Sequence, residues 1–234
     1  MTGEAALRIA VLYPEVLGTY GDRGNALVLE RRMAWRGEAV EVVDVAVGST
    51  VPTTCDLYLI GGGEDAAQSA ALQDLSRTGA LADIVSRGVP VLAVCAGLQM
   101  LGQTFEVSGG RVVPGLGLLD VTTTRLATRA VGEVVARVDG LPGVPELTGF
   151  ENHGGGTTLG PDAAPLAQVV SGTGNGAGGT EGALQGSIVA TYLHGPVLAR
   201  NPALADLLLS RATGRDLAPL DLPSVDRLRR ERLA

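Results

Sequence analysis

The chain has 234 residues, a length that fits one compact domain. All 18 of its basic residues are arginine, and the absence of lysine excludes a Walker-type phosphate-binding loop and Schiff-base chemistry, because both require the lysine amine. The 25 acidic residues give a net charge of −7, which disfavours a nucleic-acid partner.

The first half of the chain alternates short apolar runs with segments of helical length. Near-continuous apolar strands alternating with helices are typical of a parallel sheet covered on both faces. We therefore predict an α/β fold with a mainly parallel sheet, whose site lies beyond the carboxyl ends of the strands. The predicted strands cover 7–13, 39–45, 56–60 and 89–94, and the predicted helices cover 25–36, 65–87 and 97–103.

The second half has a different character, with short β-like pieces separated by glycine and proline. A further apolar strand is predicted over 187–193 and a helix over 202–213. The segment 171–182 is dense in glycine, which predicts a flexible surface loop. We expect a single domain over 1–234, with a core over about 7–209 and a helical tail over about 219–234.

Cys95 is the candidate nucleophile. It follows the apolar run V-P-V-L-A-V, and the small residues Ala96 and Gly97 come next at the start of a predicted helix. This pattern is typical of a nucleophile elbow, in which a tight turn raises the reactive side chain above the sheet. The alternative is a structural thiol, because cysteine is among the most buried residue types. Cys55 lacks a small-residue turn after it and is predicted to be structural.

The chain offers only two histidines as a base for this thiol, His153 and His194. His194 comes directly after a predicted strand and is the preferred base, because strand ends meet at the same edge of a parallel sheet. His153 lies in the glycine-rich stretch F-E-N-H-G-G-G, where it is either a hydrogen-bonded loop residue or a neighbour of the site. Two cysteines without a C-x-x-C motif and two histidines predict no metal site.

Acyl transfer also requires donors for an oxyanion. The turn Gly61–Gly63 follows the third predicted strand, and the absence of side chains lets its N–H groups approach a substrate. We predict an oxyanion hole made by the N–H groups of Gly62, Gly63 and Ala96. The alternative for the glycines is a tight strand-to-helix turn without a catalytic role.

Several motifs in fixed order resemble a known family. They are Y-G-D-R-G-N, G-G-G-E-D-A-A-Q, V-C-A-G-L-Q-M-L-G, G-L-G-L-L-D, G-F-E-N-H-G-G and T-Y-L-H-G-P. Together they resemble class I glutamine amidotransferases in the branch similar to cobyric acid synthase, and in particular the small amidotransferase subunits of lipid II isoglutaminyl synthases. The resemblance covers about residues 7–209 and implies a flavodoxin-like, three-layer domain.

The resemblance implies a glutaminase. Cys95 would attack the side-chain amide of L-glutamine, His194 would protonate the departing ammonia, and water would release glutamate from the thioester. It also places Gln99 near the substrate and makes Arg129 the clamp for the α-carboxylate, which a planar guanidinium suits. Arg125 competes with Arg129 for this role.

Two positions depart from the family pattern. Ala93 stands where a glycine commonly precedes the nucleophile, and Pro196 stands two residues after His194, where the acid of the triad is usual. The triad is therefore predicted to be incomplete in this chain, and the family implies that a Mur ligase-like partner, MurT, supplies the acid in a heterodimer.

The implied reaction is amidation of the D-glutamate α-carboxyl of lipid II to D-isoglutamine in peptidoglycan synthesis. ATP and Mg²⁺ would be bound by the partner, and no cofactor is expected in this chain. The alternatives are an amidotransferase for another acceptor, such as a corrinoid, and a catalytically silent regulatory subunit. A membrane span needs about 18 apolar residues, and neither such a run nor a signal peptide is evident, so the expected location is the cytoplasm.

Overall fold

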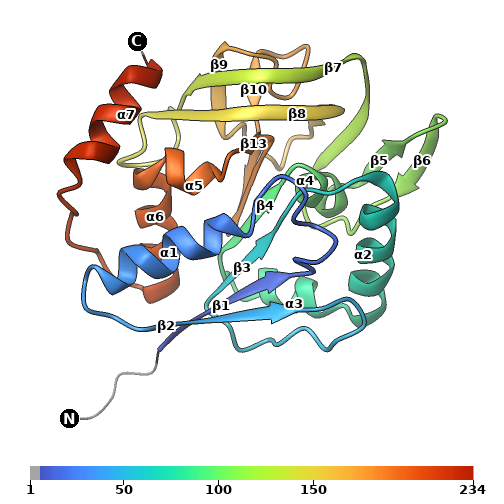
Figure 1. The fold of residues 1–234 in the computed structure, drawn as a ribbon. Coiled ribbons are helices and arrows are strands. Elements are labelled where there is room, and N and C mark those ends of the chain that lie inside the picture. The colour runs from blue at the N-terminus through green and yellow to red at the C-terminus, as the bar shows by residue number, and fades with distance from the viewer. Residues whose placement is uncertain (1–5, 234) are drawn as a thin grey trace.

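Two β-sheets organise this computed structural model, which describes residues 6–233 (Figure 1). The strands of the first sheet are β1 (Leu7–Leu12), β2 (Val40–Val45), β3 (Leu57–Ile60), β4 (Val91–Val94), β11 (Ala183–Gln185) and β12 (Ile188–Thr191). They lie in the order β11-β12-β4-β3-β1-β2. All neighbours pair in parallel except β11 with β12, which confirms the predicted mainly parallel sheet.

Helices cover both faces of this sheet. In Figure 1, α1 (Gly24–Ala34), α5 (Val197–Arg200) and α6 (Pro202–Thr213) lie on one side, and α2 (Asp65–Thr78), α3 (Ala80–Ser86) and α4 (Ala96–Leu101) lie on the other. Every residue of β3, β4 and β12 is buried as a result. The single helix predicted over 65–87 is divided at Gly79, whose φ of 62° is left-handed and ends α2.

The second sheet is mainly antiparallel. It contains β5 (Thr104–Val107), β6 (Arg111–Pro114), β7 (Val121–Arg137), β8 (Glu146–Leu159), β9 (Ala167–Ser171), β10 (Thr180–Glu181) and β13 (Leu193–His194). The short β-like pieces expected here are in fact two long strands, β7 of 17 residues and β8 of 14 residues, paired with each other. Their threonine, arginine and glycine content hides them in the sequence, because cross-strand pairing stabilises them more than local preference does.

The chain passes between the sheets at Tyr192. The strand predicted over 187–193 ends at Thr191, and after Tyr192 the pair Leu193–His194 joins β8 of the second sheet. This crossing carries His194 past the carboxyl end of β4, where Cys95 begins the turn into α4.

The glycine-dense segment 171–182 is fixed rather than flexible at its centre, so that expectation is wrong there. Asn175 is 3% exposed; its side chain accepts the N–H of Gly182 and donates to the Gly182 carbonyl. The segment then forms β10. One amide side chain thus takes the place of missing backbone partners.

A last helix, α7 (Pro223–Leu233), follows the predicted tail. None of the helices between residues 6 and 233 is both long and apolar enough to cross a bilayer.

Candidate active site

Cys95 has the geometry of a nucleophile elbow. Its φ of 53° and ψ of −102° lie outside the regions that L-residues prefer, between the end of β4 and the start of α4. The Cys95 N–H donates to the Thr191 carbonyl at 2.8 Å, which holds this turn against β12. A Cβ at Gly97 would lie 2.8 Å from the Ile60 carbonyl oxygen, so the turn requires glycine there. The predicted strand–turn–helix arrangement is present.

His194 lies in a buried hydrogen-bonded pair with Asp22. Nδ1 of His194 is 3.1 Å from Oδ1 of Asp22, and the two side chains are 3% and 2% exposed. A Cβ at Gly62 would lie 2.9 Å from Cε1 of His194 and 3.2 Å from both Oδ2 of Asp22 and Cβ of Cys95. The three side chains therefore converge around one glycine.

The environment of His194 favours its protonated form. Burial lowers the pKa of the imidazole, but hydrogen bonds and charge interactions with Asp22 and Cys95 outweigh burial and raise the pKa to about 9. At neutral pH the ring can therefore act as a proton donor.

The prediction that this chain lacks a carboxylate for His194 is wrong. Asp22 precedes His194 by 172 residues, yet β1 and β12 end at the same edge of the sheet, and the loop after β1 brings Asp22 there. Asp22 belongs to the motif Y-G-D-R-G-N, which sequence reasoning noted without assigning a role to its carboxylate.

The predicted oxyanion hole is corrected at one position. The Gly62 N–H donates to Oδ2 of Asp22 at 2.8 Å and is therefore committed to the carboxylate. Gly63 lines the same cavity as Cys95. Ala96 is the first residue of α4, and N–H groups in the first turn of a helix have no partner within the helix. Gly63 and Ala96 stay as candidate donors.

A cavity of about 60 Å³ adjoins Cys95. Its lining includes Gln99, Arg125, Arg129 and His153, contributed by α4, β7 and β8. The cavity thus brings together the predicted nucleophile, both candidate arginines and the second histidine.

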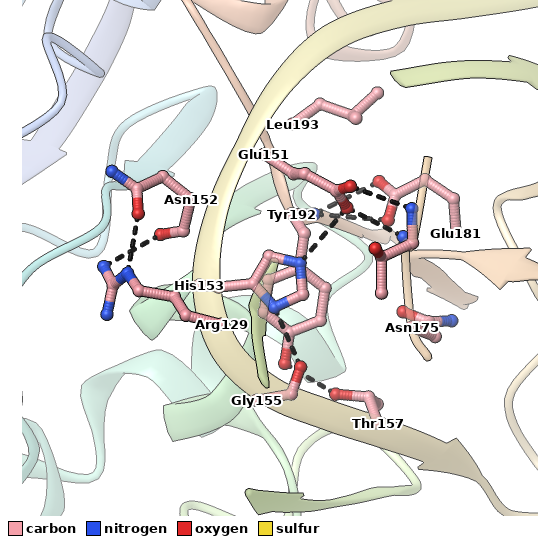
Figure 2. Close-up of polar contacts among 12 residues, drawn as sticks. Arg129, Glu151, Asn152, His153, Gly155, Thr157, Asn175, Glu181, Tyr192 and Leu193 are labelled. Carbon is pink, nitrogen blue, oxygen red and sulfur yellow. Dashed lines mark hydrogen bonds and ion pairs between the residues drawn. The ribbon is translucent and has the colours of Figure 1, made fainter. Parts of the chain in front are cut away.

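Both arginines carry their guanidinium groups to this cavity. Arg129 donates from Nε to Oδ1 of Asn152 at 2.7 Å (Figure 2) and from Nη2 to the Tyr20 hydroxyl at 3.0 Å. Arg125 donates to Oγ of Ser108 at 3.4 Å. Arg129 is the better fixed of the two, which favours it as the carboxylate clamp.

Tyr20 is a cavity residue that sequence reasoning missed. Its ring centroid lies 4.7 Å from that of His194, and its hydroxyl donates to Glu64 at 2.8 Å. The signal was again the motif that contains Asp22.

Gln99 lies one helical turn after Cys95, on the same face of α4. Its Oε1 accepts from Nε2 of Gln68 at 2.9 Å, and its Nε2 donates to the Tyr192 hydroxyl at 3.3 Å. The structure thus places Gln99 at the cavity, as predicted.

His153 is a buried strand residue rather than a loop residue (Figure 2). Its Nδ1 is 2.8 Å from the Gly155 carbonyl, and its Nε2 is 3.5 Å from Oε2 of Glu151. Cys55 belongs to the hydrophobic core, where burial raises the pKa of its thiol, as fits a structural cysteine.

Comparison with known proteins gives a consistent picture. Residues 8–202 match the model of the CobB/CobQ-like glutamine amidotransferase domain. The chain is 34% identical over 90% of its length to the lipid II isoglutaminyl synthase (glutamine-hydrolyzing) subunit GatD of Staphylococcus aureus, covering 86% of that protein. It is also 34% identical to the Streptococcus pneumoniae GatD subunit, over 88% of this chain and 80% of that one.

More distant relatives include larger proteins. The cobyric acid synthase of Pelotomaculum thermopropionicum is 35% identical over 82% of this chain, which spans only 38% of that enzyme. Among solved structures, a glutamine amidotransferase crystal structure superposes with a TM-score of 0.59 at 19% identity, covering 88% of this chain and 98% of the other, and supports the fold. The chain is therefore a member of the CobB/CobQ-like glutamine amidotransferase family.

Proposed function

We propose that the chain is the glutaminase subunit of a lipid II isoglutaminyl synthase. It hydrolyses L-glutamine through a Cys95 thioester and delivers ammonia to a Mur ligase-like partner, MurT, which amidates the D-glutamate α-carboxyl of lipid II. The convergence of Cys95, His194 and Asp22 around Gly62 carries this proposal. The identity to the GatD subunits, over most of both chains, selects the acceptor.

Each step follows from the geometry of the site. The Cys95 sulfur attacks the carbonyl carbon of the glutamine amide, and the N–H groups of Ala96 and Gly63 stabilise the oxyanion. When the C–N bond breaks, His194 gives its Nε2 proton to the departing ammonia. Water then attacks the thioester and gives a proton to His194, which releases glutamate and restores the thiol. Asp22 accepts the Nδ1–H of His194 throughout and stabilises the imidazolium.

The binding of glutamine uses the polar lining of the cavity. Arg129 pairs with the α-carboxylate of glutamine, and Gln99 positions the side chain next to Cys95. The cavity of about 60 Å³ is too small for a whole glutamine, so binding moves the side chains that line it, among them Tyr20.

Amide formation from a carboxylate requires activation by ATP, and this chain has no lysine for a Walker loop. ATP and Mg²⁺ are therefore assigned to the partner, and the complex to the cytoplasm. Because Asp22 already contacts His194, we expect the isolated subunit to hydrolyse glutamine without a carboxylate from the partner.

The decisive experiment replaces the nucleophile in the reconstituted complex. Cys95→Ala should reduce glutamine-dependent amidation of lipid II by about 10³-fold or more, because the covalent route is lost. Amidation with ammonium chloride should be unchanged, since the partner then receives ammonia directly. Cys55→Ala, which removes the structural thiol, is the matched control and should retain both activities.

The other outcomes separate the alternatives. A silent regulatory subunit would keep both activities after Cys95→Ala. An amidotransferase for a corrinoid would release glutamate from glutamine but leave lipid II unmodified with its partner present. Either result would overturn the proposal.

A further inference from the structure

We propose that Glu151 and His153 form a buried positioning pair that holds Tyr192, and through Tyr192 the substrate-facing amide of Gln99. The pair thereby sets the affinity of the site for glutamine. This inference rests on the proposed glutaminase function.

The pair is built into the protein interior. Glu151 is 3% exposed, His153 2% and Tyr192 0%. Burial raises the pKa of Glu151, but hydrogen bonds from His153 and from the N–H groups of Gly174 and Thr173 outweigh it and lower the pKa. A charged carboxylate at this depth is costly unless its partners are fixed. The glycine-rich segment supplies two of them, at 2.8 Å each.

His153 is held on three sides, as Figure 2 shows. The Gly155 carbonyl can only accept, so Nδ1 of His153 donates to it at 2.8 Å. Nε2 faces Oε2 of Glu151 at 3.5 Å and has no other partner. The imidazole stacks on the Tyr192 ring with centroids 3.9 Å apart and planes inclined by 15°. The orientation of this imidazole therefore fixes the plane of the Tyr192 ring.

Tyr192 passes this constraint to the cavity. Its hydroxyl contacts Oγ1 of Thr157 at 2.7 Å and accepts from Nε2 of Gln99 at 3.3 Å. A Cβ at Gly155 would lie 2.5 Å from Nε2 of Gln99 and 2.9 Å from the Tyr192 hydroxyl. The residue that receives the His153 hydrogen bond thus also packs tightly against Gln99, and little room is left for another arrangement.

The pair is separate from the reacting groups. His194 takes its hydrogen bond from Asp22, and neither Glu151 nor His153 contacts that carboxylate. Loss of the pair should therefore weaken the binding of glutamine and leave the chemical step intact. Such a change raises KM and preserves kcat.

The test is steady-state glutaminase kinetics of the full chain. Tyr192→Phe removes the hydroxyl that holds Gln99, and His153→Ala removes the stacked ring. Each should raise KM for glutamine about five- to tenfold, the usual effect of one lost hydrogen bond or ring contact, with kcat within about twofold. The double variant should show less than the product of the two effects, because both act through the same contact.

Tyr58→Phe is the matched control. Tyr58 is also fully buried, and its hydroxyl bonds the Pro52 carbonyl in the first sheet, outside the cavity. Its KM should equal that of the wild type. Thermal melting of each variant shows that it is folded, and Tyr192→Phe, which changes only one atom, decides the matter should His153→Ala not fold.

Two failures are distinguishable. If the wild-type chain releases no glutamate, and a diazoketone analogue of glutamine does not label Cys95, the proposed function fails and this inference fails with it. If the wild type is active but Tyr192→Phe leaves KM unchanged, or lowers kcat instead, the positioning pair alone is refuted.

Discussion

Asp22 is the residue on which the protonation of His194 depends. Its Oδ1 lies 3.1 Å from Nδ1 of the ring, and its Oδ2 accepts the Gly62 N–H. The carboxylate therefore keeps one orientation while it stabilises the imidazolium. The same hydrogen bond prevents the Gly62 N–H from serving an oxyanion, so one acid determines both the base and the shape of the hole.

Asp22→Asn should lower kcat for glutamine hydrolysis by about 10²-fold or more, because the ring loses its oriented acceptor. It should also lower the pKa of His194 from about 9. The ring donates a proton to ammonia, so activity falls where the ring deprotonates. The alkaline limb of the kcat profile should therefore move to lower pH in the variant.

The measurement is the pH dependence of glutamate release for both proteins. Asp44→Asn is the control, because this carboxylate is partly exposed and pairs with Arg23 at the surface. An unchanged alkaline limb in Asp22→Asn would show that Asp22 does not govern the proton on His194.

At the scale of single elements, α7 is attached to the domain through one side chain. Arg229 donates to the Arg200 carbonyl and Oδ1 of Asn201 at 2.9 Å each, and to the Glu146 carbonyl at 2.6 Å. No residue of α7 is buried. A helix of 11 residues is marginal alone in water, so this anchor determines whether α7 forms.

Arg229→Ala should release α7 without unfolding the domain. Hydrogen exchange of the α7 amides should become at least about tenfold faster, as loss of charge-assisted hydrogen bonds implies, while exchange in β3 and β4 stays slow. Arg230→Ala, at an exposed position of the same helix, is the control. Equal protection of α7 in the two variants would contradict this anchoring role.

At the scale of the whole molecule, a buried carboxylate connects the two sheets. Glu181 of β10 is 0% exposed and accepts from the Thr191 hydroxyl and the Tyr192 N–H, where the chain leaves the first sheet. Burial raises its pKa to about 7, although the hydrogen bonds act in the opposite direction. The fold is thus closed by an acid that prefers to be neutral.

This predicts a pH-dependent free energy of unfolding. A folded-state pKa above the ordinary 4.5 means that the stabilising contribution of Glu181 is complete below pH 4.5 and is lost as the pH rises through about 7. Glu181→Gln remains neutral and should avoid this loss. A shift of this size corresponds to about 3 kcal/mol, so the variant should gain up to about that amount relative to the wild type between pH 4.5 and pH 8.

Urea unfolding at the two pH values measures this difference. Glu41→Gln, at an exposed position, supplies the reference for removing one carboxylate. A gap between wild type and Glu181→Gln that is the same at both pH values would mean that Glu181 does not titrate in this range.

The sequence by itself determined the first sheet and the nucleophile. Strands such as 89–94 are continuous apolar runs, and buried parallel strands require that composition whatever their neighbours are. The position of Cys95 is likewise local, because a strand, a small-residue turn and a helix follow one another directly. His194 was found because it ends a strand that reaches the same edge.

Only the tertiary structure decided the partners of these residues. The pairing of β7 with β8 depends on contacts between distant segments, and their polar composition gives no local sign of it. Asp22 reaches His194, and Glu151 reaches the glycine-rich segment, through loops whose paths the fold sets. A motif supplies the chemical group, but a hydrogen bond of about 3 Å requires that the chain be folded around it.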